Sequence, residues 1–294
     1  MTNMNVRNVP QKRIGMVVHP ERKGAIEASE FVEAWCEKAG YEVLRVTKAS
    51  QCQGLSLVLS LGGDGTMLRA IDLCLVYQVP VLGVNFGHLG YLTEIEPPEL
   101  GKALENFFAG EYELEERMTL DIEISRQPRG TSESVHEAER FVALNELVVE
   151  KSHSGNVVKL NVSIADTHFL DYEADGLIIA TPTGSTAYSF SARGPVVSPT
   201  LRAMIMTPIS PHMLFDRALV LDSNEAVEIR VLQGPHATIM VDGINRHVLA
   251  PNESVKVRSS LLNALVIKLG KRDFRVILKS KFGLTEKSMG SILD

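Results

Sequence analysis

The hydrophobic pattern of the chain changes character near Gly110. Before that point, four short apolar runs alternate with three stretches of helical periodicity. We expect strands over residues 13–18, 41–46, 55–61 and 80–84, and helices over residues 25–38, 66–78 and 98–109. Strands that alternate with helices are typical of a parallel sheet covered by helices on both faces. The first part of the sequence therefore predicts a doubly wound, Rossmann-like α/β domain.

After Gly110 the strand-like runs follow one another with few helical stretches between them. They occupy residues 114–125, 141–150, 157–165 and 175–180, and more short strands are expected up to residue 257. Alternating apolar and polar residues in the third run indicate a half-buried strand. The dipeptides at 165–166 and 242–243 suit two-residue hairpin turns. With a single helix expected over residues 185–192, this part predicts an antiparallel, sandwich-like all-β domain.

These patterns divide the chain into three segments. We expect the α/β domain over residues 1–110 and the all-β domain over residues 111–260. A C-terminal segment, residues 261–294, holds one more apolar run and a basic tail. Residues 127–139 are polar and charged, which predicts an exposed loop.

Composition narrows the classes of function. The 294 residues include 30 Lys and Arg against 36 Asp and Glu, which gives a net charge of −6. The chain therefore lacks the excess of basic residues that is typical of nucleic-acid-binding proteins. No apolar run reaches the ~18 residues of a membrane-spanning helix, and the polar first residues are unlike a signal peptide. The 3 cysteines and 8 histidines show no spacing typical of a disulfide framework or a metal site. We therefore expect a cytoplasmic protein that binds neither nucleic acid nor membrane.

The strongest local signal is the sequence GGDGT at residues 62–66, between a buried strand and a helix. This position is the carboxyl edge of the sheet, where open α/β folds bind ligands. The glycines Gly62, Gly63 and Gly65 allow positive φ angles and a close approach of a ligand to the backbone. Thr66 suits the N-cap of the helix, and free N–H groups at the helix start favour an anion such as phosphate.

Asp64 is unusual in such a turn because a carboxylate repels phosphate. It fits if it binds a metal ion or takes a proton from an attacking hydroxyl, and either role indicates phosphoryl transfer. The alternative is a tight turn whose aspartate caps backbone N–H groups. Arg69, one helical turn later, would either reach a phosphate or lie on a solvated helix face. Neither a P-loop nor a GxGxxG fingerprint is present, so the usual ATPase and dehydrogenase motifs are excluded.

Two further motifs carry polar groups to the ends of predicted elements. The sequence TPTGSTAYS at residues 181–189 follows a strand and places hydroxyl and N–H groups at a helix start. Tyr188 there either stacks on a base or is a core tyrosine beside an ordinary cap. Asn145 and Glu146 form a polar pair in an apolar strand, which is costly unless a partner satisfies them. Because neighbouring side chains of a strand point to opposite faces, both contact one ligand only if the strand ends or bulges there.

In combination, these motifs resemble those of the bacterial NAD kinase family. The resemblance rests on GGDGT, NFGHLGYLT at residues 85–93, Asn145-Glu146, and Asp175-Gly176 leading into TPTGSTAYS and Gly194-Pro195. GGDGT alone is shared with diacylglycerol and sphingosine kinases, whereas the combination is specific. The resemblance implies phosphoryl transfer from ATP or polyphosphate to the 2′-hydroxyl of the adenosine ribose of NAD, which forms NADP. It also implies a divalent metal, usually Mg²⁺, bound mainly through the substrate phosphates, and a homodimer or homotetramer.

The same resemblance assigns roles to individual residues. Asp64 would be the catalytic carboxylate that acts on the ribose hydroxyl, and Gly65 would lie against the nucleotide. Asp175 would contact the nicotinamide end of NAD. The other residues implied to bind NAD are Arg69, Asn145, Glu146, Thr186, Ala187, Tyr188, Ser189 and Ser191. The C-terminal segment would return to pack on the N-terminal domain.

Three positions depart from the family pattern. Glu173 stands where many members carry a basic residue, Ile244 follows Asp242-Gly243 where DGQ is usual, and Phe86 replaces a small or polar residue. These departures bear on the contacts to the nicotinamide and the phosphates, and on the choice between NAD and NADH.

Two alternatives stay open beside an NAD kinase. A lipid kinase of the diacylglycerol or sphingosine type shares GGDGT but does not account for the Asn145-Glu146 pair together with TPTGSTAYS. A non-catalytic NAD(H)-binding regulator would be favoured by loss of Asp64, and Asp64 is present.

Overall fold

The computed structural model describes residues 12–87, 90–125, 138–153, 155–232, 234–270 and 273–284. Its contacts divide the chain into two compact units. Unit 1 comprises Met1–Glu116 and Ala264–Asp294, and unit 2 comprises Arg117–Asn263. Most of the loop expected over residues 127–139 lies outside the described residues.

Unit 1 contains a six-stranded sheet of order β2-β1-β3-β4-β18-β5. Its strands are β1 (Arg13–Val18), β2 (Glu42–Arg45), β3 (Leu57–Gly62), β4 (Val81–Asn85), β5 (Glu113–Arg117) and β18 (Ala264–Lys268). The pairs β1–β2, β1–β3, β3–β4 and β4–β18 are parallel. The α/β prediction is thus confirmed, and so is the return of the C-terminal segment, since Val266 of β18 pairs with Val81 of β4.

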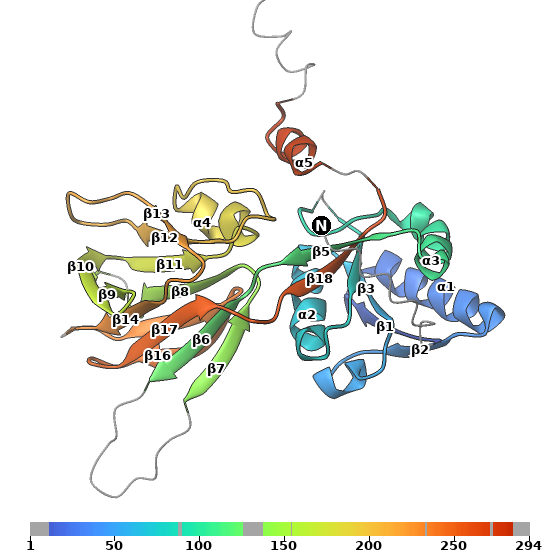
Figure 1. The fold of residues 1–294 in the computed structure, drawn as a ribbon, viewed down its shortest axis with the longest axis horizontal. Helices are drawn as coiled ribbons and strands as arrows, with labels where there is room; N and C mark the ends of the chain where they lie inside the picture. Colours follow the sequence, from blue (N-terminus) through green and yellow to red (C-terminus); the bar gives the residue numbers. More distant parts are fainter. Residues whose placement is uncertain are drawn as a thin grey trace, which may run out of the picture. The chain divides into compact units, whose positions relative to one another are not determined.

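Helices cover both faces of this sheet (Figure 1). They are α1 (Lys23–Ala39), α2 (Asp64–Cys74) and α3 (Leu100–Ala109), with 3-10 turns at Ala49–Cys52, Leu75–Tyr77 and Pro97–Glu99. A further helix, α5 (Phe274–Lys281), follows β18 in the chain. Leu57, Leu59 and Leu61 of β3 share one core cluster with the buried residues of α1 and α3. Because strand side chains alternate between faces, Val58 and Ser60 point to the face that α2 covers. Burial on both faces explains why β3 is almost wholly apolar.

Unit 2 is a sandwich of two six-stranded antiparallel sheets, as predicted (Figure 1). The first has the order β10 (Thr167–Ala174), β9 (Val158–Ile164), β14 (Val227–Val231), β17 (Ser254–Ser259), β6 (Leu120–Ser125), β7 (Glu139–Ala143). The second has the order β13 (Leu219–Asp222), β12 (Ala203–Ile209), β11 (Gly176–Ala180), β8 (Glu146–Lys151), β15 (Ala237–Val241), β16 (Ile244–Leu249). One large apolar cluster fills the space between the two sheets.

Both predicted hairpin turns of unit 2 are confirmed. Ala165 and Asp166 join β9 to β10 with φ angles of 49° and 61°. Asp242 and Gly243 join β15 to β16 with φ angles of 47° and 77°. Two successive positive φ angles are the mark of the turn that matches the twist of an antiparallel pair.

Three predicted elements are wrong as single elements. Residues 114–125 form two strands, β5 and β6, in the sheets of different units. Residues 141–150 form β7 and β8, which belong to the two different sheets of unit 2. Residues 185–192 form a 3-10 turn (Gly184–Thr186) and a short helix α4 (Tyr188–Ser191), because Ala187 between them has a non-helical ψ of −129°. Among the described residues, no helix has the length and apolar character needed to cross a membrane.

Candidate active site

The GGDGT turn connects β3 to α2 in unit 1. Gly63 is the N-cap of α2, with a φ of −125° and no side-chain cap bond. The prediction of Thr66 as N-cap is therefore wrong, because the helix begins two residues earlier and Thr66 lies buried within its first turn.

None of the three glycines adopts the positive φ angle that glycine allows. Gly62 is needed for a close approach, because a Cβ there would lie 2.1 Å from Thr66 Oγ1. A Cβ on Gly63 or Gly65 would meet no atom within 4 Å, so the backbone at these two glycines is open to a ligand.

The carboxylate of Asp64 is fixed by the backbone that follows β4. Its Oδ2 accepts the Tyr91 N–H at 3.0 Å, and its Oδ1 accepts the Leu92 N–H at 3.1 Å. Gly90 packs directly against this carboxylate, since a Cβ there would lie 2.2 Å from Asp64 Oδ1. Each carboxylate oxygen keeps a further lone pair that a hydroxyl could use. The aspartate thus caps N–H groups of a neighbouring segment and still presents an acceptor.

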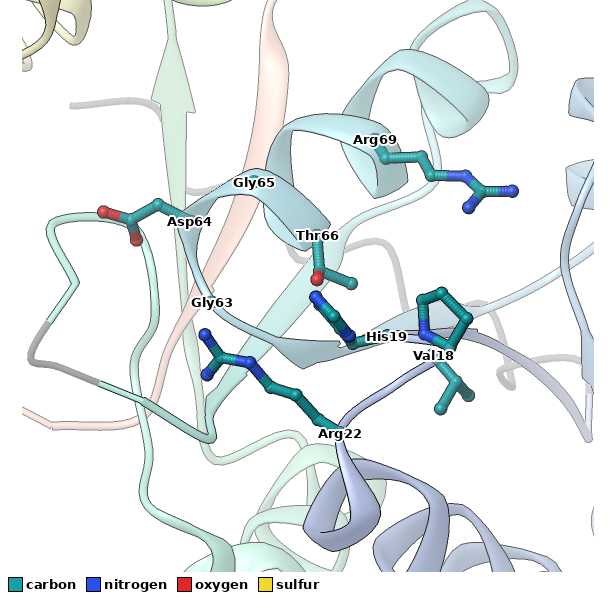
Figure 2. Close-up of a pocket in the computed structure, with 9 residues that line it drawn as sticks. Val18, His19, Arg22, Gly63, Asp64, Gly65, Thr66 and Arg69 are labelled. Atoms are coloured by element: carbon teal, nitrogen blue, oxygen red, sulfur yellow. The ribbon is translucent and has the colours of Figure 1, made fainter.

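A cleft of about 390 Å³ lies beside the turn (Figure 2). Its lining residues are Val18, His19, Pro20, Arg22, Gly63, Asp64, Gly65, Thr66 and Arg69. Arg69 is exposed and has no ion-pair partner among the described residues. The sequence analysis missed His19 and Arg22. Their position directly after β1 was the available signal, because the carboxyl ends of neighbouring parallel strands meet at one edge of a sheet.

In unit 2, the strand predicted over residues 141–150 is interrupted at Leu144 and Asn145, between β7 and β8. The carboxylate of Asp242 causes this break by accepting three successive N–H groups, from Leu144 at 2.8 Å, Asn145 at 2.8 Å and Glu146 at 3.0 Å. Amides bound in this way are unavailable to a strand ladder. The break that the sequence required for Asn145 and Glu146 to face one ligand is therefore present, and a residue predicted only as part of a hairpin turn produces it.

The two members of this pair differ in environment. The side chain of Asn145 is partly exposed and has no hydrogen-bond partner among the described residues. Glu146 is buried, and its Oε2 lacks a partner. Burial, and then the charge of Asp242, raise the pKa of Glu146 to about 8, although the Tyr188 N–H bond to its carboxyl opposes the rise. Near pH 7 most Glu146 side chains are therefore protonated, and a protonated carboxyl both donates and accepts.

The TPTGSTAYS segment covers the outer face of β8 and β11. Val148 and Ile178 of these strands form a cluster with the partly buried Tyr188. Thr186 and Ala187 are partly buried and Ser191 is exposed. Ser189 is fully buried, with its Oγ 3.0 Å from Thr207 Oγ1, so its hydroxyl takes part in the fold.

Asp175 lies at the other end of the same strand pair. Glu146 pairs with Ala180 and Glu150 pairs with Gly176, so Asp175 lies five residues along the strand from the partner of Glu146, or about 17 Å between backbones. Lys151 Nζ donates to Asp175 Oδ1 at 2.5 Å. Tyr188 is near both ends: its N–H binds the Glu146 carboxyl, while burial, and then the charges of Glu150 and Asp175, raise the pKa of its hydroxyl. The structure thus places Asn145 and Glu146 at one end of the strand pair and Asp175 beside Lys151 at the other.

Of the three departures from the family pattern, the structure shows local contacts for two and explains nothing about the third. Glu173 forms an ion pair with Lys159 at 2.6 Å on the neighbouring strand. The Phe86 ring packs at the start of α1, 3.2 Å from where a Cβ on Gly24 would lie. Ile244 is 53% exposed, and nothing in the structure explains the choice of isoleucine there.

Family models match both units of the chain. The model of the ATP-NAD kinase N-terminal domain matches residues 42–112, and that of the ATP-NAD kinase C-terminal domain matches residues 144–269. An NAD kinase from Heliobacterium modesticaldum is 37% identical over 282 residues, which are 91% of this chain and 97% of that protein. An NAD kinase from Moorella thermoacetica is 39% identical over 286 residues, which are 92% of this chain and 89% of that protein.

Two solved structures share the fold. A crystal structure of yeast NADH kinase complexed with NADH is similar with a TM-score of 0.81 and 22% identity, over 94% of this chain and 89% of that one. A crystal structure of an NAD kinase from Archaeoglobus fulgidus in complex with ATP is similar with a TM-score of 0.71 and 23% identity, over 90% of this chain and 96% of that one.

Proposed function

The chain belongs to the NAD kinase family, and from that premise we propose how its residues phosphorylate NAD. It is a kinase that binds NAD and ATP and transfers a phosphoryl group to the 2′-hydroxyl of the adenosine ribose, which yields NADP and ADP. One observation carries the residue assignment: the Asp64 carboxylate is fixed by two backbone N–H groups at the edge of a cleft that holds two arginines.

Asp64 acts as the general base in this proposal. The ribose hydroxyl oxygen forms a bond to the γ-phosphorus of ATP, the bond to the bridging oxygen of ADP breaks, and the hydroxyl proton moves to Asp64. A carboxylate held by the Tyr91 and Leu92 amides keeps one orientation during this step. Such positioning is the main contribution that a phosphoryl-transfer site makes.

Asn145, Glu146 and Tyr188 bind the adenosine part of NAD in this proposal. The side-chain amide of Asn145 and the protonated carboxyl of Glu146 offer hydrogen-bond donors and acceptors to the ribose and the base. The Tyr188 ring stacks on the adenine, with Thr186, Ala187 and Ser191 beside it.

At the other end of β11, Asp175 binds the carboxamide side of NAD. Ser189 contributes by fixing the segment, since its hydroxyl is turned to Thr207.

We also propose that the reaction uses a divalent metal, in the first instance Mg²⁺. Among the described residues, no group of three or more His, Cys, Asp or Glu side chains could hold a metal ion. In this proposal the donor phosphates would bind most of the metal, and Asp64 would be the carboxylate of the cleft available to it. Such a metal supplies neutralisation of phosphate charge.

Further expectations concern the assembly, the location and the donor. We propose a homodimer or homotetramer, which exposed apolar side chains on two edge strands support: Val220 on β13, and Ile244 and Val248 on β16. The three cysteines, all buried and none in a disulfide, support a reducing compartment such as the cytoplasm. Polyphosphate is proposed as a second donor beside ATP.

A coupled assay tests the proposed function. Purified protein is incubated with NAD, ATP and Mg²⁺, and NADP is detected through an NADP-specific dehydrogenase. The expected result is NADP formation that depends on both substrates, with no phosphorylation of diacylglycerol or sphingosine vesicles. Lipid phosphorylation without NADP would favour the lipid kinase. Saturable NAD binding without turnover under ATP, polyphosphate, NADH and Mn²⁺ would favour the non-catalytic regulator.

A further inference from the structure

A short segment after β1, residues 19–22, runs beside the GGDGT turn. β1 ends at Val18, which pairs in parallel with Leu61 of β3. The His19 N–H donates to the Leu61 carbonyl at 2.9 Å. The segment therefore leaves the sheet next to Gly62, at the edge where open α/β folds bind ligands.

Arg22 in this segment is held in place at one end of its guanidinium. Its Nη1 donates to the Phe86 carbonyl at 2.5 Å, and a Cβ on Gly87 would lie 2.3 Å from the same nitrogen. Phe86 itself is tied to the turn, because its N–H donates to the Gly62 carbonyl at 2.7 Å. Among the described residues no carboxylate pairs with Arg22, although a guanidinium has five N–H donors and Phe86 takes one of them.

His19 presents a second donor. Its Nδ1 accepts the Glu21 N–H at 3.3 Å, so the neutral ring carries its proton on Nε2. Figure 2 shows the His19 ring and the Arg22 guanidinium on the side of the turn formed by Gly63 and Thr66. Asp64 and Arg69 leave α2 in opposite directions in the same view.

The charge and shape of the cleft indicate the class of its ligand. The lining residues include two arginines and a histidine against one carboxylate, an excess of basic groups that favours an anion. No Phe, Tyr or Trp is among its described lining residues, so it offers no aromatic platform for a nucleobase. The amides of Asp64 and Gly65, the first two residues of α2, precede the first N–H that bonds to the N-cap carbonyl, that of Thr66, and they add to the attraction for phosphate.

We propose that Arg22 and His19 bind the phosphate chain of the phosphoryl donor and hold it beside Asp64. This inference rests on the proposed function, since it names the residues that position the donor in the same reaction. The arginine neutralises charge on the transferred phosphate and the imidazole donates to a neighbouring phosphate oxygen.

The test uses Arg22→Met, Arg22→Lys and His19→Gln, with Arg13→Met as the control. Arg13 is a partly exposed arginine of β1 whose ion pair with Glu42 lies away from the cleft. Binding of ATP and of inorganic triphosphate is measured by isothermal titration without NAD, and KM for NAD and for ATP is measured in the coupled assay. We expect Arg22→Met to weaken both phosphate ligands about 10- to 100-fold, the size of one to two charge-assisted hydrogen bonds.

His19→Gln is expected to weaken the same ligands less, and Arg22→Lys to restore part of the loss, while the control and KM for NAD stay within about twofold of the wild type. If Arg22→Met and His19→Gln both bind ATP and triphosphate as the wild type does, the proposal is overturned even if NADP is formed. A parallel rise of KM for NAD would also overturn it, because it would indicate a structural role. Loss of triphosphate binding in a protein that forms no NADP would support this site and contradict the proposed function.

Discussion

Asp242→Asn is the sharpest perturbation that the structure offers in unit 2. Asp242 sits in the β15–β16 turn at a φ of 47°, a conformation that asparagine tolerates as well as aspartate. The substitution keeps the size of the side chain and removes its charge. It also replaces one acceptor oxygen by an NH₂ group, which then faces an N–H donor of the chain between Leu144 and Glu146.

The magnitude follows from the three hydrogen bonds. A hydrogen bond to a charged group contributes about 1.5–3 kcal/mol, against about 1 kcal/mol for a neutral pair. The variant loses one bond outright and the charge assistance of the other two. Because most Glu146 side chains are protonated near pH 7, the charge repulsion between Asp242 and Glu146 is small there and its relief offsets little of this loss. We therefore expect the free energy of unfolding to fall by about 2–4 kcal/mol.

Asp166→Asn is the matched control. Asp166 occupies the equivalent turn between β9 and β10 at a φ of 61°, and its exposed carboxylate pairs with Lys256, at 3.0 Å. An exposed pair contributes about 0–1 kcal/mol. Urea unfolding compares both variants with the wild type, and the coupled assay should show KM for NAD raised at least ~10-fold in Asp242→Asn alone. If Asp242→Asn costs no more than Asp166→Asn, the carboxylate does not cause the break at Asn145.

Two further substitutions test other parts of the site. Gly90→Ala should lower turnover at least ~10-fold with little change in KM for NAD, because the added methyl displaces the Asp64 carboxylate; unchanged turnover in the coupled assay would contradict the packing argument. In Glu146→Gln the pH dependence of stability should weaken. Because burial raises the pKa of Glu146 from 4.5 to about 8, the folded wild type retains a proton that the unfolded chain loses. Its free energy of unfolding therefore falls as the pH rises from about 5 to 8, and urea unfolding across this range should show a flatter profile for the variant.

Local sequence patterns predicted much of the fold because the relevant physics is local. The strands and helices of residues 13–109 follow from apolar periodicity, and the turn at Asp242-Gly243 from its dipeptide. The division of residues 141–150 into two strands was not predictable in this way. It depends on the Asp242 carboxylate, which lies 97 residues from the Asn145 amide that it binds.

The residues of the candidate site were likewise predictable only where they belong to a local sequence motif. GGDGT identified the turn and Asp64, because glycines and a carboxylate at a strand end are a local signal. His19 and Arg22 lie more than forty residues earlier and reach the turn only through the parallel pairing of β1 with β3. The start of α2 at Asp64 rather than after Thr66 was also missed, although the close contact of Thr66 with Gly62 is a local one.

The measurement that tests the account most directly is NADP formation by Asp64→Asn beside the wild type and Asp72→Asn. Asp72 is an exposed aspartate on the same helix with no partner among the described residues, so its substitution should leave turnover unchanged. We predict that Asp64→Asn binds NAD but turns over at least ~100-fold more slowly at saturating NAD, ATP and Mg²⁺. Turnover equal to that of the wild type would show that Asp64 is not the group that receives the hydroxyl proton.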